Sequence, residues 1–194
     1  RQRQMCIRDR WNNGLTNTGR YLIARMLYMD GLIIVTTTIG IFGTSVMGIS
    51  ISNIIIVAIL CNVSGAVGCY IFGIFFKNDK IVIIISLALL SAIIISMSVN
   101  TNPTVFIILA VLGTFFSGPL QSSSRVVMAK LIPDEMQGLG FGMFTFSGKA
   151  TAFLGPLCAA AITFLFSQRI GFGFSIVLLL SGMLLMLKVS YQDN

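Results

Sequence analysis

Long apolar runs separated by short polar breaks dominate the chain. About 20 predominantly apolar residues are enough for a helix to cross a bilayer, and the runs reach or approach that length. The breaks hold glycine, proline, asparagine, lysine or arginine, which end or interrupt helices and prefer water. The pattern predicts six spanning segments, at approximately residues 21–47, 54–76, 81–99, 104–124, 138–166 and 170–187.

These segments are expected to be helices, because only helices and closed barrels satisfy the backbone in lipid and barrel strands alternate over about 10 residues. The sequence therefore predicts an all-α membrane protein. Its expected parts are a cytoplasmic entry segment at 11–20, a six-helix lobe at 21–189 and a tail at 190–194. Arg125–Gln137 is expected to be the most polar loop, with an amphipathic piece near its end.

The six segments fall into two triplets of similar order. The first and fourth carry a polar residue or a helix breaker, the second and fifth are rich in small residues, and the third and sixth are uniformly apolar. Small residues permit close helix packing, and the uniformly apolar segments are expected to face lipid. Three crossings are an odd number, so the triplets have inverted topology, as in secondary transporters.

Charge fits a membrane protein better than a nucleic-acid-binding one. Charged residues make up 10% of the chain, against about 25% in soluble domains. The net charge is +7, but the basic residues never form a patch with stacking aromatics, so no nucleic acid partner is expected. They instead predict orientation, with both termini cytoplasmic and Arg169 alone on the far side. The basic residues assigned to the cytoplasmic side are Arg20, Arg25, Lys77, Lys80, Arg125, Lys130 and Lys188.

The first ten residues, RQRQMCIRDR, differ in kind from all that follows. They are dense in arginine and match one translated frame of a common sequencing-library adapter. We therefore expect residues 1–10 to be an artefact, and the true protein to be longer at its N-terminus.

The chain contains no histidine, which removes histidine-based acid–base and nucleophilic catalysis. It also has no GxSxG nucleophile elbow, no paired intramembrane aspartates and no cluster typical of a metal site. An enzyme is disfavoured, and no cofactor or metal is expected.

Lys149 lies inside the fifth segment, between Gly148 and a Gly155-Pro156 break. A lysine at membrane depth costs roughly 2.5–3.5 kcal/mol on insertion scales, so it usually has a partner or a wet cavity. Ser147, two residues earlier, is a weaker candidate for the same site. The alternative is an anchor whose stem snorkels towards the nearer interface.

Asp30 and Arg25 lie in the first segment, with Asp30 near the expected bilayer midplane. Five residues place them about 140° apart on a helix, so each must find partners on other helices. Lys149 and Arg125 are the candidate partners of Asp30. A carboxylate at this depth can exchange a proton or bind a cation, as a coupled transporter requires; the alternative is a structural ion pair.

The fourth segment places Gln121 and Arg125 just after Gly118-Pro119. Polar side chains there either bind a solute or tie helices together, and Arg125 is also a candidate topology anchor. The Gly118-Pro119 and Gly155-Pro156 pairs are predicted hinges.

Three motifs in order, ARMLYMDG, SRVVMAKLIP and FGMFTFSGKATAFLGP, resemble the C-terminal half of the Atg22-like vacuole effluxer family of the major facilitator superfamily. The resemblance covers about residues 20–156. It implies a twelve-helix transporter of which this chain holds helices seven to twelve, with the first, second, fourth and fifth of these around the cavity. Its fungal members export amino acids from the vacuole.

These observations together predict part of a secondary active transporter that moves a small solute, possibly amino acids, by alternating access. Its partners would be the lipid bilayer, the solute and an N-terminal six-helix half. The membrane would be the plasma membrane in a prokaryote or the vacuolar membrane in a fungus. The alternative is a self-contained six-helix channel or assembly protein.

Overall fold

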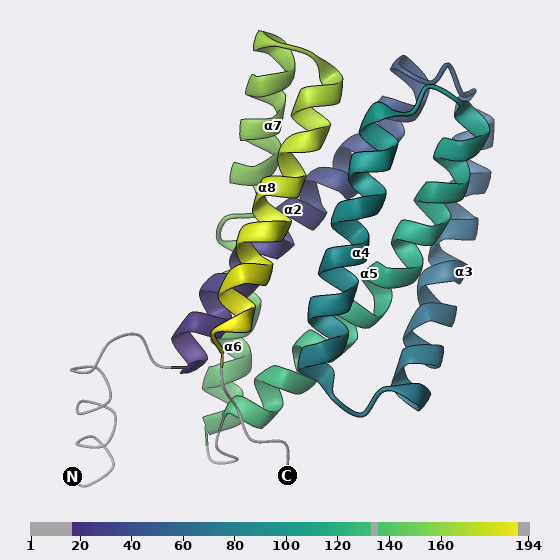
Figure 1. Ribbon diagram of the computed structural model, residues 1–194. Helices are drawn as coiled ribbons and strands as arrows, with labels where there is room; N and C mark the ends of the chain where they lie inside the picture. Colours follow the sequence, from purple (N-terminus) through teal and green to yellow (C-terminus); the bar gives the residue numbers. More distant parts are fainter. Residues whose placement is uncertain (1–16, 133–135, 190–194) are drawn as a thin grey trace, which may run out of the picture.

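The computed structural model of the chain describes residues 17–132 and 136–189 (Figure 1). The proposed adapter segment 1–10, most of the entry segment 11–20 and the tail 190–194 lie outside these residues. Within the described part the regular structure is entirely helical. Its helices are α2 (Asn17–Ser45), α3 (Ile51–Phe75), α4 (Asp79–Val99), α5 (Pro103–Leu131), α6 (Gln137–Lys149), α7 (Leu154–Leu165) and α8 (Gln168–Leu187).

Six of the described stretches are long and apolar enough to cross a membrane, α6 and α7 together forming the fifth. The predicted all-α class and six spans are confirmed. The fifth span, however, is a broken helix, because the link Ala150–Phe153 is not helical.

Four of the helices start at polar breaks in the sequence, and a residue of each break caps the helix that follows. Ser50, Asn78 and Ser167 each accept a hydrogen bond from the backbone N–H three residues later, and so cap α3, α4 and α8. Asn102 caps α5 in a similar way, with Pro103 at its first turn. Such side chains satisfy N–H groups that lack a partner within the helix.

The prediction of a loop at Arg125–Gln137 is wrong for its first half, because α5 continues to Leu131. Arginine, lysine, methionine and alanine all favour helices, and neither glycine nor proline interrupts the chain before Pro133. The polarity of this stretch marks the end of the membrane span rather than the end of the helix. Lys130 on this last turn forms a salt bridge of 3.0 Å with Asp79 at the start of α4.

The two triplets interleave. In the first triplet, α2 packs against α8 and against the broken α6–α7 helix, which belong to the second triplet. In the second triplet, α5 packs against α4 and α3, which belong to the first. Each leading helix thus contacts the second and third helices of the other triplet, as expected for two inverted three-helix repeats. This arrangement is consistent with the C-terminal lobe of a major-facilitator-type fold.

Small residues set the distance between α3 and α5. Pro119 has no N–H, so the Phe115 carbonyl loses its usual partner within α5. This carbonyl lies directly against Gly68 of α3, where a side chain would collide with it. Gly118 meets the Gly65 carbonyl in the same way. The predicted close packing of the second segment is therefore confirmed.

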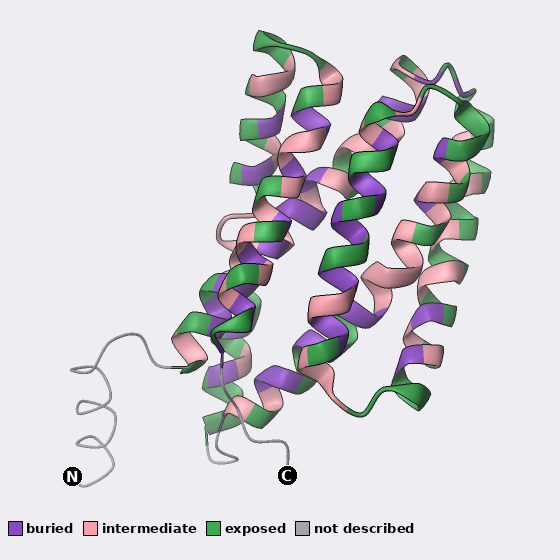
Figure 2. Cartoon of the chain, in the orientation of Figure 1, coloured by how far each residue is buried: buried purple, intermediate pink, exposed green. Residues whose placement is uncertain are grey.

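Burial differs strongly between the helices (Figure 2). Half of the most apolar stretch of α4 is buried, whereas only 6% of that stretch in α3 is buried. Within this lobe α4 packs between α5 and α8, so only the other half of this stretch is left to face lipid. Among the described helices, α3 carries the most exposed large apolar side chains.

Candidate functional site

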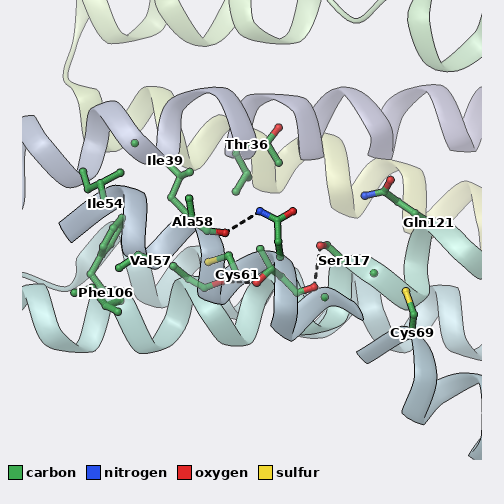
Figure 3. Close-up of a pocket in the computed structure, with 18 of the residues that line it drawn as sticks. Thr36, Ile39, Ile54, Val57, Ala58, Cys61, Cys69, Phe106, Ser117 and Gln121 are labelled. Atoms are coloured by element: carbon green, nitrogen blue, oxygen red, sulfur yellow. Dashed lines mark hydrogen bonds between the residues drawn. The ribbon is translucent and has the colours of Figure 1, made fainter. Parts of the chain in front are cut away.

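A first cavity lies between α2, α3 and α5 and has a volume of about 590 Å³ (Figure 3). Most of its lining is apolar, with Ile39, Ile54 and Phe106 gathered at one end. Gln121 and Arg125 of α5 line it with Asn62 of α3, which donates a hydrogen bond of 2.8 Å to its own helix. We call this space the apolar cavity.

A second cavity, of about 460 Å³, lies between α2, α5 and α6, and we call it the basic cavity. Its charged lining consists of Arg25 from α2, Arg125 from α5 and Lys149 from α6. Among residues 17–132 and 136–189, neither aspartate nor glutamate lines it. Arg125 also lines the apolar cavity, so this one side chain borders both spaces.

Arg25 is the buried member of the basic cavity, with only 8% of its surface exposed. Its Nη1 donates to the Phe144 carbonyl at 2.7 Å and to Ser147 Oγ at 3.3 Å. The guanidinium carbon lies 3.4 Å from the centre of the Phe144 ring, a cation–π contact. Gly148 makes room for it, because an added Cβ would lie 2.5 Å from Nη1.

Lys149 and Arg125 are exposed, in contrast to Arg25. Lys149 is the last residue of α6, at the point where the fifth span breaks. Neither residue forms an ion pair with another residue of the described ranges. The structure thus brings together three of the predicted site residues, Arg25, Arg125 and Lys149. Ser147 lies beside them and accepts a hydrogen bond from Arg25.

Asp30 is buried, and its partner is Thr151 in the link between α6 and α7. Thr151 Oγ1 donates to Asp30 Oδ1 at 3.1 Å. Among residues 17–132 and 136–189, the expected ion pair with Lys149 or Arg125 is not formed. The reason is the broken helix, which turns Lys149 into the basic cavity and carries Thr151 to α2.

The break itself lies earlier than the Gly155-Pro156 pair predicts. These two residues belong to the first turn of α7, where a proline is readily accommodated because its missing N–H would be unpaired anyway. Gly155 is buried against the Asp30 backbone. Gly118 and Pro119, the other predicted hinge, lie inside a continuous α5.

Two tyrosines that sequence reasoning missed hold α2 to α5. Tyr21 donates to the Ser124 carbonyl and Tyr28 to the Ser124 hydroxyl, whose own proton goes to the Leu120 carbonyl. Both tyrosines lie on the Arg25 face of α2, four residues before it and three after it. This helical spacing from Arg25 could have indicated the two tyrosines from the sequence. No pattern in the sequence indicated Thr151 or Phe144.

Comparison with known proteins decides the family. The profile of the family described as "Vacuole effluxer Atg22 like" matches residues 10–193, nearly the whole chain. The chain belongs to this Atg22-like family.

The Atg22-like chain is also similar to individual proteins. It is 26% identical over 161 residues to an uncharacterized MFS-type transporter, YxiO, of Bacillus subtilis (strain 168), a match that covers 82% of this chain and 37% of YxiO. It is 38% identical over 73 residues to autophagy-related protein 22 of Cryptococcus neoformans var. neoformans serotype D (strain B-3501A). That match covers 37% of this chain and 13% of the fungal protein.

This Atg22-like chain therefore spans little more than a third of the length of its bacterial relative. Its family is one of transporters, and its six apolar spans make it a multi-pass integral membrane protein.

Proposed function

We propose that this chain is the C-terminal six-helix half of a secondary active transporter, which moves a small solute across a membrane by alternating access. The family match and the two inverted triplets support this function. In such transporters the solute site lies near the midplane, at discontinuous helices. The observation that carries the proposal is the broken α6–α7 helix, which has a buried carboxylate at its break and cationic side chains beside it.

In this proposal the residues of the two cavities have different roles. Arg25, Lys149 and Arg125 bind the solute, with Ser147 holding Arg25 in place. Asp30 exchanges a proton, and its bond to Thr151 ties that step to the broken helix. Gln121 contacts the solute from the apolar cavity.

The two halves would move against each other around these cavities. The missing half would be an N-terminal six-helix lobe, whose contact would cover the exposed face of α3. The ends of α2 and α8 near Asn17 and Leu187 would face the cytoplasm, together with the Asp79–Lys130 salt bridge. The membrane would be the plasma membrane in a prokaryote or the vacuolar membrane in a fungus.

Amino acids are the first solutes to test. The intact protein that carries this chain would be reconstituted into liposomes, and uptake of a panel of labelled amino acids would be measured with and without a pH gradient. We expect saturable uptake that the gradient drives and that excess unlabelled solute inhibits. Unsaturable flux that ignores the pH gradient would instead indicate the channel alternative, and the absence of any flux would contradict transport of this class.

A further inference from the structure

We propose that the basic cavity is a binding site for the oxyanion group of a small organic molecule, a carboxylate or a phosphate, with Arg25 as its fixed donor. The inference deepens the transport function proposed above, and it rests on that function only in identifying the bound molecule with the transported solute.

The charged side chains that line the basic cavity are all cationic among the described residues. Arg25, Arg125 and Lys149 come from three different helices and converge on one space of about 460 Å³. The nearby carboxylate on α2, Asp30, already accepts a hydrogen bond from Thr151 and does not line the cavity. These three cations repel one another, no carboxylate of the described residues lines the space with them, and a bound anion removes that repulsion.

The Arg25 guanidinium is buried and incompletely hydrogen-bonded. Its Nη1 is bound to the Phe144 carbonyl, but its Nε has no partner among the described residues. A buried charge without a counter-charge is unfavourable, and so is an unpaired buried N–H. An oxyanion bound in the basic cavity supplies the missing counter-charge.

The protein's own contacts hold Arg25 in place in the basic cavity. Phe144 stacks on the guanidinium, and Gly148 leaves the space that it occupies. Tyr21 and Tyr28, on either side of Arg25 along α2, both bind Ser124, the residue that precedes Arg125. These bonds fix the helix of one arginine against the helix of the other.

The geometry also indicates what the anion carries. A planar guanidinium binds carboxylate or phosphate oxygens in pairs, whereas the ammonium of Lys149 acts as a point charge. Beside these groups the lining supplies Met29, Phe141 and Phe144, which suit an apolar substituent. The preferred ligand is therefore a small oxyanion with an apolar group attached.

Binding is tested on the purified intact protein in detergent, without any gradient, by isothermal titration. The probes are 3-phenylpropionate, its neutral amide 3-phenylpropionamide, and inorganic phosphate. We expect the acid to bind and the amide, which has nearly the same shape, to bind at least roughly tenfold more weakly, the loss expected for a charge-assisted hydrogen bond. Phosphate binding tighter than that of the acid would assign the site to phosphorylated solutes.

The variants Lys149→Met and Arg125→Gln alter exposed side chains, so we expect both proteins to fold normally. Each should weaken binding of the acid by about tenfold. Lys188→Met removes an exposed charge at the end of α8, away from the cavity, and should leave binding unchanged. Arg25→Lys keeps the charge but loses the planar guanidinium. It should weaken binding of the acid more than binding of phosphate.

Equal binding of acid and amide, or no binding of either anion, would overturn the site. So would an equal loss in Lys188→Met and Lys149→Met. Because the titration needs no transport, its outcome is separate from that of the uptake experiment. Anion binding without uptake would support the binding site and contradict the transport function. Uptake without anion binding would support the transport function and contradict the binding site.

Discussion

Thr151 donates a hydrogen bond of 3.1 Å to the buried carboxylate of Asp30, joining the break in the fifth span to the middle of the first. The two residues are 121 positions apart in the chain. Any change in the charge of Asp30 therefore acts directly on the segment that interrupts the helix.

Asp30→Asn should separate coupling from solute movement. Asparagine can still accept the hydrogen bond from Thr151, so the fold should be kept, but it cannot exchange a proton. We expect loss of accumulation driven by a pH gradient and retention of solute exchange between equal pools. Both are measured as uptake into liposomes. Asp79→Asn is the control, because Asp79 lies in a surface salt bridge and should keep coupling. Normal accumulation in Asp30→Asn would exclude a coupling role.

Lys149→Met should abolish transport through the loss of charge. Methionine keeps the length and the apolar stem, so insertion into the membrane should improve slightly, since a central lysine costs roughly 2.5–3.5 kcal/mol. Lys149→Arg should give partial transport, because the charge is kept in a different shape. Transport is measured at equal expression in membranes. If Lys149 only anchors the helix, both variants will transport normally.

Gly148→Ala should displace Arg25. The added methyl would lie 2.5 Å from Nη1, and Arg25 would lose its bond to the Phe144 carbonyl. We expect about 1 kcal/mol of lost stability, the value of one hydrogen bond, together with weaker anion binding. Gly142→Ala on the same helix is the matched control, since open space surrounds that position. Thermal unfolding of the two purified variants measures the difference, and equal melting and binding would contradict the assigned contact.

Gly68→Ala should loosen α3 from α5. The obstacle is the Phe115 backbone carbonyl, which cannot move aside as a long side chain can. Overpacking of this kind costs about 1–3 kcal/mol, and we expect a lower melting temperature and lower yield. Gly73→Ala, further along α3 and surrounded by open space, should be neutral or slightly stabilising, because alanine favours helix. A Gly68→Ala protein as stable as Gly73→Ala would show that the helices can separate at no cost.

Several features followed from the sequence alone. The lengths of the apolar runs predicted six spans, because a bilayer fixes how many residues a helix needs. The polar breaks predicted where helices begin, since serine and asparagine cap helix ends through local bonds. The small residues around Gly68 predicted close packing, and the tertiary structure has it. These properties depend on a residue and its neighbours in the chain.

Other features were decided only by tertiary packing. The sequence gives no sign that α6 ends at Lys149, because the break depends on Thr151 reaching Asp30 and on Gly155 packing against α2. It placed Arg25, Arg125 and Lys149 in separate segments. The family resemblance put those segments around a cavity, but it did not show which side chains would meet there. Which cations converge depends on the rotation of each helix about its axis. That rotation is set by contacts between residues about 100 positions apart, such as Tyr21 and Ser124.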